Sequence, residues 1–254
     1  VIVGFVVAGS GEKPVLARAV GPGLAQFGVG DALPRPRLQV YRAGSETPFA
    51  TNTGWTTAPN SAAIAAAATQ AGLFALSPAS ADSALLATLA RGGYTTVITD
   101  AGGGVGNGLV EIYDLASADP ALRLANLSSR ALVGSGDATL IAGMTVTGGA
   151  PKPILVRAIG PTLSTFGVSG SLPRPRLTLF NGAGAAVAQN LNWTAAANAL
   201  EIARVSEQVG AFPLRTGSGD SALLLDLAPG NYTAQVTGEG GTLGIALIEV
   251  YELP

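Results

Sequence analysis

Four charged residues that interrupt apolar segments are the strongest candidates for chemistry in this sequence. Two arginines lie in the runs VLARAV and ILVRAI, and two glutamates lie in LVEIYDL and LIEVYEL. An arginine-tuned carboxylate is one way to build a catalytic acid or base. A buried charge must be paired, and the same types recur without an adjacent histidine or second acid. We therefore predict structural ion pairs that fix strand register, within a domain or with the equivalent acid of a neighbour: Arg18–Glu111 and Arg157–Glu249.

Other residue types limit the available chemistry further. The chain has no histidine and no cysteine, which removes the usual general base, the commonest metal ligand and all thiolate chemistry. Asp82 and Asp220 each precede Ser-Ala-Leu-Leu and could ligate a cation, but such an aspartate more often caps a turn by accepting backbone N–H bonds. A glycosidase needs two acids in one cleft, about 5–10 Å apart, and no such pair stands out. We predict no catalytic residues, no metal and no cofactor.

The motif PRPRL occurs twice and holds two arginines in a segment stiffened by prolines. It is either a solvated rigid loop or a contact with a neighbouring domain or subunit, with an acidic rim as the partner. The candidate interface residues are Arg35, Arg37, Arg174, Arg176, Asp114 and Glu252.

Two tryptophans, Trp55 and Trp193, follow an expected hairpin in each half of the chain. A tryptophan at this place most often closes the end of a core, while an exposed one stacks on a sugar ring. Both residues are therefore candidates for glycan stacking, with core packing as the alternative.

The amino-acid composition limits the kinds of partner that this protein can bind. Charged residues make up 12% of the chain, about half the usual share of ~25%. Either small neutral residues form the surface, or neighbouring domains or subunits cover weakly polar surface. The fourteen Lys and Arg residues are scattered and the net charge is −2, so we expect no nucleic-acid binding. No apolar run reaches the ~18 residues of a membrane span.

The sequence repeats itself. Gly11–Leu38 and Ala150–Leu177 share 17 of 28 residues, and Asp82–Thr95 and Asp220–Thr233 share 10 of 14. Copies of this length are domains in tandem rather than short solenoid turns. We predict one domain over residues 1–118 and a second over 119–254.

The two copies are not cut at the same point. A leader, Arg123–Thr139, precedes the second copy, whereas the first copy starts directly at VIVGFVVAG, as an excised portion of a longer array would. If the leader supplies an edge strand to one domain, the first domain here lacks its own.

Each copy combines short apolar or alternating segments with one helical stretch. The helices are predicted at Ser61–Gln70 and Ala196–Val209. Two hairpins are expected per copy. In the first copy, one joins Arg37–Tyr41 to Pro48–Asn52, and the other joins Ser83–Leu89 to Tyr94–Thr99 through the turn ARGG. Seven or eight strands with frequent turn signals indicate a mainly β fold. We predict two tandem jelly-roll-like β-sandwich domains, each with one short helix. The first-copy strands are Val1–Ala8, Pro14–Val20, Arg37–Tyr41, Pro48–Asn52, Ser83–Leu89, Tyr94–Thr99 and Leu109–Tyr113.

The segments LTLFNGAGAAVAQNLNW, DSALLLDLAPGNYTAQVTG and GIALIEVYEL resemble the pre-peptidase C-terminal domain. The upstream block is similar to a tandem repeat of large secreted or surface proteins of environmental bacteria. The resemblance implies jelly-roll sandwiches at an extracellular or cell-surface location. Some members of the family bind calcium through acidic loops, but the comparable segments here, NTGW and NLNW, contain no aspartate.

Two functional hypotheses follow. The first is a non-enzymatic structural repeat protein that associates with itself or with neighbouring repeats, head to tail, into a filament or surface array. The second is a carbohydrate-binding or adhesive module of a secreted protein, with glycans as partners.

Overall fold

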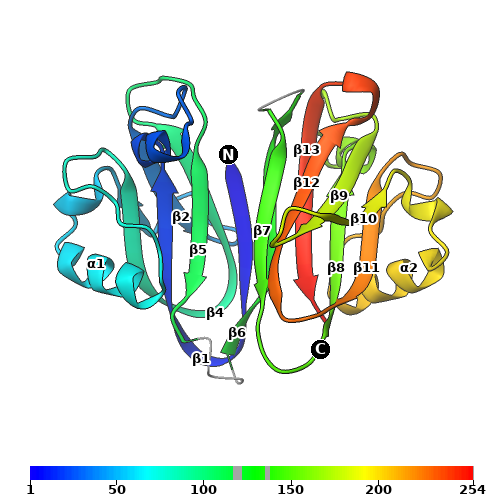
Figure 1. The fold of residues 1–254 in the computed structure, drawn as a ribbon, viewed down its shortest axis with the longest axis horizontal. Coiled ribbons are helices and arrows are strands. Elements are labelled where there is room, and N and C mark those ends of the chain that lie inside the picture. The colour runs from blue at the N-terminus through cyan, green and yellow to red at the C-terminus, as the bar shows by residue number, and fades with distance from the viewer. Residues whose placement is uncertain (117–121, 135–137, 254) are drawn as a thin grey trace. The chain divides into compact units, whose positions relative to one another are not determined.

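The fold is mainly β, as predicted. The computed structural model describes residues 1–116, 122–134 and 138–253. The chain forms two compact units, Val1–Ala125 and Asn126–Pro254, and each is an antiparallel β-sandwich with one α-helix (Figure 1). The boundary predicted between residues 118 and 119 lies outside the described residues.

The described strands of the second unit form two antiparallel sheets. One has the order β11–β8–β13–β6 and the other β10–β9–β12–β7. Consecutive strands of the chain lie in different sheets where a glycine-containing turn separates them, as between β7 and β8. The strands are β6 (Leu122–Val133), of which residues from Asn126 onward belong to this unit, β7 (Leu140–Val146), β8 (Lys152–Ile159), β9 (Pro175–Asn181), β10 (Ala186–Asn190), β11 (Ser221–Leu227), β12 (Gly230–Gly238) and β13 (Gly244–Glu252).

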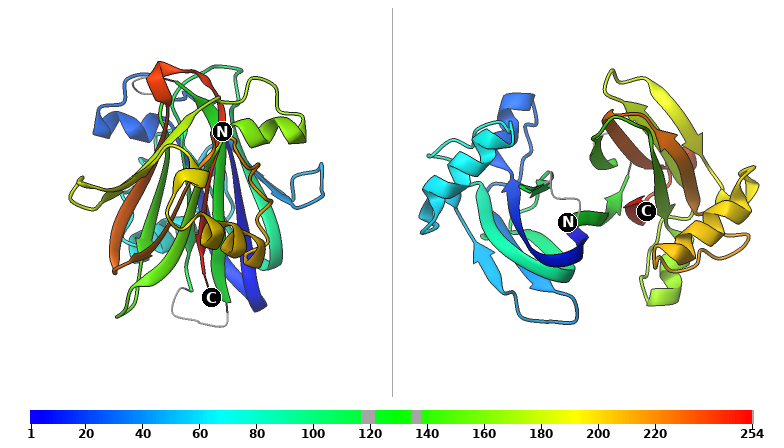
Figure 2. Two further views of the ribbon diagram at one scale, coloured as in Figure 1. Left: turned by 90° about the vertical axis from the view of Figure 1, so that its right-hand side faces the viewer. Right: turned by 90° about the horizontal axis from the view of Figure 1, so that it is seen from below.

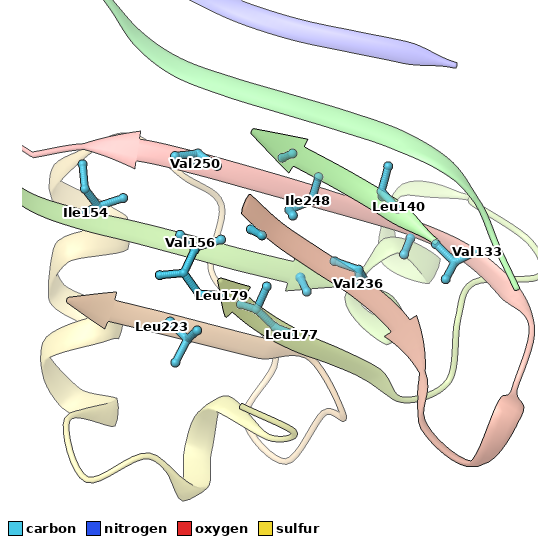
Figure 3. Packing of buried hydrophobic residues seen from close by; sticks show 14 of the residues in the cluster. Val133, Leu140, Ile154, Val156, Leu177, Leu179, Leu223, Val236, Ile248 and Val250 are labelled. Carbon is cyan, nitrogen blue, oxygen red and sulfur yellow. The ribbon is translucent and has the colours of Figure 1, made fainter. Parts of the chain in front are cut away.

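The core of the second unit lies between these two sheets (Figure 3). Val156 and Ile248 point inward from one sheet, and Leu177, Leu179 and Val236 point inward from the other. Alternate residues of each strand face this core, as the period of a β-strand requires. Each fully buried aliphatic side chain contributes about 1.5–3 kcal/mol through the area it removes from water.

A helix covers the other face of the β11–β8–β13 sheet (Figure 2). In α2 (Ala199–Gln208), Ile202 and Val205 lie on one face and pack against Leu155 and Ile159 of β8. The helix begins three residues later than predicted, because the backbone of Ala196 is extended and Asn198 is the N-cap. In the first unit, α1 (Ser61–Gln70) matches the predicted range.

The first unit builds the same two layers from fewer, longer strands. The first half of β1 pairs with the second half of β4, and the second half of β1 pairs with the first half of β4 and with β5. β4 also pairs with β2, and β2 with β3. The strands of this unit are β1 (Ile2–Val20), β2 (Pro36–Arg42), β3 (Ala50–Asn52), β4 (Ser83–Asp100) and β5 (Leu109–Asp114).

Short 3-10 helices occur in both units. They are η1 (Pro22–Phe27), η2 (Trp55–Thr57), η3 (Pro161–Phe166), η4 (Trp193–Ala195) and η5 (Glu239–Gly241).

The hairpin predicted between Ser83–Leu89 and Tyr94–Thr99 is wrong. These residues form one strand, β4, which passes from one layer to the other. The equivalent strands of the second unit, β11 and β12, lie in different sheets. Gly92 and Gly230, with φ of 149° and 154°, bend the chain without reversing it. The strands predicted at Val1–Ala8 and Pro14–Val20 are likewise one strand, β1, whereas the predicted β2–β3 hairpin is confirmed.

Within the described residues, no helix combines the length and the apolar character that crossing a membrane requires.

Candidate functional site

The predicted Arg157–Glu249 ion pair is present in the second unit. The two residues lie directly opposite each other on β8 and β13. The Arg157 Nε and Nη2 atoms lie 2.8 and 2.7 Å from Glu249 Oε2, and Arg157 Nη1 donates to the carbonyl oxygen of Phe212 at 2.7 Å. Arg157 is fully buried, and its guanidinium lies over the Phe212 ring, 4.7 Å from the centroid.

The predicted Arg18–Glu111 ion pair is also present, in the first unit. These residues are opposite on β1 and β5, with 2.8 Å between Arg18 Nε and Glu111 Oε2. Arg18 Nη1 donates to the Phe74 carbonyl oxygen at 2.9 Å, and the guanidinium lies 4.3 Å from the Phe74 centroid. The same four-part arrangement of arginine, glutamate, phenylalanine carbonyl and ring therefore recurs in both units.

In each unit, a tyrosine hydroxyl donates a hydrogen bond to the second carboxylate oxygen of the glutamate. The hydroxyl of Tyr113 donates to Glu111 Oε1 at 2.6 Å, and that of Tyr251 donates to Glu249 Oε1 at 3.1 Å. Burial and the neighbouring carboxylate raise the pKa of both tyrosines above its usual range, so both remain neutral donors. Each glutamate is held by an arginine on one oxygen and a tyrosine on the other, which is the geometry of a register-fixing pair.

Asp82 and Asp220 cap turns, as the favoured interpretation predicted. Asp220 accepts hydrogen bonds from the backbone N–H groups of Gly160 and Thr162, at 2.8 and 3.3 Å, and from the hydroxyls of Thr162 and Ser218. Asp82 accepts equivalent bonds from Gly21, Gly23 and Ser80. Both aspartates are fully buried, and they hold the entry to η1 and η3. In the part of the chain that the structure describes, no three acidic side chains gather in a way that could hold a metal ion.

Both acids of the rim proposed as a partner for the PRPRL arginines form ion pairs within their own units. Asp114 pairs with Lys13 at 2.6 Å, and Glu252 pairs with Lys152 at 2.7 Å. Lys13 is fully buried and also donates to the Ala116 carbonyl oxygen at 3.2 Å. These two lysines recur at equivalent positions (GEKP and APKP), so the repeat carried a signal for this second pair.

The four PRPRL arginines divide into two groups. Arg35 and Arg174 are exposed, whereas Arg37 and Arg176 are half-buried on β2 and β9. Arg176 forms an ion pair with Glu239, which the sequence did not point to. Arg35 and Arg174 therefore remain the exposed members of the candidate interface.

Both tryptophans are buried in the core, which contradicts the glycan-stacking prediction. Trp55 and Trp193 are 9% and 7% exposed, and they pack in the clusters beneath α1 and α2. Their indole N–H groups donate to the carbonyl oxygens of Ser77 and Arg215, at 3.1 and 3.2 Å. Because so little of either side chain is exposed, the two tryptophans close the core instead.

A pocket of about 560 Å³ lies between α2 and the loop that follows it. Trp193, Ile202, Pro213 and Leu214 line it, so its wall is mainly apolar. Ser206 also lines it, and its buried hydroxyl has no hydrogen-bond partner among the described residues. The charged residues in its lining are Arg204, which is bound to Glu201 and Gln208, and Glu207.

Asp100 organises the loop that follows β4 in the first unit. It accepts backbone hydrogen bonds from Gly104 at 2.8 Å and from Arg35 and Gly102 at 2.7 Å. These bonds lower the pKa of the Asp100 carboxyl, and the bond from Gly104 has the largest effect. The bonds link the first PRPRL segment to this loop.

We expect Asp100 to titrate below the ordinary aspartate pKa of about 3.9. Because its pKa is lowered on folding, its contribution to stability is present above the unfolded value and is lost as the pH falls through the folded value. An NMR titration of the side-chain carboxyl measures this directly. A midpoint for Asp100 at or above the ordinary aspartate value of about 3.9 would contradict the prediction.

One edge of the first unit differs from its counterpart in the second. β13 lies between β8 and β6, and there Ile248, Val250 and Tyr251 are at most 8% exposed. β5 pairs with β1 on one side, and no strand pairs with its other side among the described residues. The equivalent side chains on β5 are half-buried, and Leu109 is 37% exposed.

Residues beyond β5 cover the first-unit core only in part. Leu124, near the start of β6, packs against the cluster that contains Phe5 and Val7 and that Ile112 also contacts. This contact covers apolar surface without adding a strand to β5. We call the unpaired side of Leu109–Asp114 the β5 edge.

Comparisons with known proteins give no family. No family model matches the chain, and no curated protein matches it. A chain of the Sulfolobus turreted icosahedral virus gives a TM-score of 0.26 at 10% identity, covering 98% of this chain and 85% of its own. The M60 catalytic domain with two CBM51 domains of Clostridium perfringens ZmpB gives 0.24 at 6% identity, with coverages of 97% and 33%. PBCV-1 VP54, fitted into the virophage Sputnik, gives 0.20 at 8% identity, with coverages of 99% and 92%. Likenesses at this level carry no argument about function.

Proposed function

We propose that this chain is a non-enzymatic structural repeat protein of the cell exterior, whose sandwich domains associate head to tail into a filament or surface array. The observation that carries the proposal is the β5 edge. An unpaired edge presents backbone N–H and C=O groups that another strand can pair with. A repeated contact between unlike surfaces forms a ring when its rotation closes and an open fibre when it does not, and the proposal is the open fibre.

The way the second unit is completed supports this proposal. The outer side of β13 pairs with Asn126–Val133 of β6, which comes from the leader. No described strand lies at the corresponding side of β5. The proposal includes an extracellular or cell-surface location.

The repeated charged groups are also consistent with a structural role. Arg18, Lys13 and their counterparts in the second unit each pair with an acid of the same unit. The aspartates that precede Ser-Ala-Leu-Leu are bound to backbone N–H groups. These groups stabilise the sandwich, so what remains to interact with a partner is the surface and its edge.

We expect the full chain to form filaments or larger assemblies as its concentration rises, because each added subunit pairs one more edge. Negative-stain electron microscopy and small-angle X-ray scattering measure this. Leu109→Lys places a charge on the β5 edge and is expected to reduce the assembled fraction at least tenfold. Leu200→Lys is the matched control, since Leu200 is 90% exposed on α2. A chain that stays monomeric at every concentration, with no filaments on the grid, would sink the proposal.

A further inference from the structure

We infer that the pocket between α2 and the loop that joins it to β11 binds a small neutral molecule that is apolar except for one hydrogen-bonding group, which pairs with the hydroxyl of Ser206. The pocket has a volume of about 560 Å³, and small-molecule sites have volumes of roughly 300–1,000 Å³. Its lining residues belong to the second unit, so this site does not depend on the proposed assembly.

Ser206 supplies the hydrogen-bonding group of this site. The residue is 4% exposed, and its hydroxyl is buried with no hydrogen-bond partner among the described residues. A hydroxyl can donate one hydrogen bond and accept others, and leaving it unpaired in an apolar environment costs free energy. Because Ser206 lines the pocket, a ligand hydroxyl or carbonyl placed beside it removes this cost.

The wall around Ser206 suits an apolar ligand. Four apolar residues of the lining are each at most 8% exposed, namely Trp193, Ile202, Ala211 and Leu214. An apolar molecule against such a wall is stabilised in proportion to the apolar area that leaves water. Apolar contact therefore provides most of the affinity, and the hydrogen bond to Ser206 fixes the orientation of the ligand.

The charges of the lining favour a neutral ligand over an anion. Arg204, the cation of the lining, donates to the two carboxylate oxygens of Glu201 at 3.0 and 2.6 Å. Glu207, the other charged residue, is exposed, so solvent screens its charge and a cation gains little from it. An anion in this pocket would have no unpaired cation in the described lining and would lie near the carboxylate of Glu207.

The first unit has a larger residue at the equivalent place. The backbone N–H of Ala211 donates to the Ser206 carbonyl oxygen at 2.9 Å. After α1, the N–H of Leu73 donates to the Ala68 carbonyl oxygen at 3.0 Å, so Leu73 corresponds to Ala211 and Ala68 to Ser206. Leu73 and Ala68 both pack against the cluster beneath α1. The second unit therefore has a smaller side chain at one position, which leaves space, and a hydroxyl at the other.

Two probes of the same shape test the hydrogen bond. In 2-naphthol a hydroxyl stands where 2-methylnaphthalene has a methyl group, and 2-naphthoate is the anionic analogue. In a ¹H–¹⁵N NMR titration of the full chain, we expect 2-naphthol to shift the amides of residues 203–214 with a saturable curve. We expect 2-naphthoate to bind at least tenfold more weakly.

Ser206→Ala is expected to weaken 2-naphthol at least fivefold, about the effect of losing one hydrogen bond, and to leave the affinity for 2-methylnaphthalene unchanged or higher. Ser164→Ala is the matched control, because Ser164 is an exposed serine of the same unit outside the pocket lining. We expect it to change neither affinity.

Ala211→Leu gives the second unit the residue of the first and is expected to fill the pocket. Both neutral probes should then bind at least tenfold more weakly, while the urea midpoint of the second unit stays the same or rises. If this variant fails to fold, Ser206→Ala decides. The inference is overturned if 2-naphthol gives no saturable shift at residues 203–214, if Ser206→Ala weakens the two neutral probes equally or neither of them, or if a folded Ala211→Leu chain binds them undiminished.

Discussion

Replacing Glu249 by alanine is expected to destabilise the second unit by about 3–5 kcal/mol, the usual effect of removing one partner of a buried ion pair. Arg157 is fully buried, and without the carboxylate it keeps a single carbonyl, that of Phe212, as its hydrogen-bond acceptor. The hydroxyl of Tyr251 also loses its acceptor. A buried cation left in this state strongly disfavours folding.

Urea unfolding measures the change. Each unit contains one of the two tryptophans, so in a Trp55→Phe background the fluorescence of Trp193 reports the second unit alone. Glu201→Ala is the control, because Glu201 pairs with Arg204 on the exposed side of α2, and we expect no measurable shift from it. Replacing both partners, Arg157 by methionine and Glu249 by leucine, is expected to restore much of the stability. A shift for Glu249→Ala no larger than for Glu201→Ala would show that the pair does not stabilise the fold.

The residues of this pair could be predicted because sequence alone limits the possibilities there. An arginine within an apolar strand has to find a counter-charge, and the acid that recurs within an apolar strand of each copy is the simplest partner. The repeat also gave a second, independent instance of the same pattern. The Lys13–Asp114 pair obeys the same rule, but Lys13 stands at the start of an expected strand beside Glu12, where the sequence does not indicate burial.

Other features depend on tertiary contacts that no local pattern records. The ARGG segment has the composition of a tight turn, yet Gly92 bends β4 instead of reversing it, because β1 provides a partner strand through both layers. The Arg176–Glu239 pair has no counterpart in the first unit, where Ala101 stands at the position of Glu239, so the repeat gave no signal for it. The burial of Trp55 and Trp193 likewise depends on the helices that cover them.

The open edge was predictable only in outline. The leader was recognisable because it precedes the second copy. That it forms a strand on β13, in a defined register, is a property of the folded second unit. The side chains of β5 are half-buried where the equivalent side chains of β13 are buried.

Replacing Asp220 by alanine is expected to destabilise the second unit by roughly 3 kcal/mol, because buried donors are left without an acceptor. The backbone N–H groups of Gly160 and Thr162 and the hydroxyl of Ser218 all donate to this carboxylate. Asp220→Asn keeps one acceptor oxygen, and we expect it to lose about half as much. The exposed Asp226 on β11 provides the control Asp226→Ala, and unfolding followed by Trp193 fluorescence measures all three.

The same variants distinguish a turn cap from a cation site. A cap predicts that hydrogen exchange of the Gly160 and Thr162 amides speeds up in Asp220→Ala, and that added calcium leaves the melting temperature of the unmodified chain unchanged. If calcium raises that temperature and Asp220→Ala abolishes the rise, Asp220 is a ligand and the structural interpretation fails. Because its oxygens already accept bonds from two backbone amides and two hydroxyls, we expect the cap. The buried charges of this chain then serve to hold the sandwich together, and contact with partners falls to its surface and to the β5 edge.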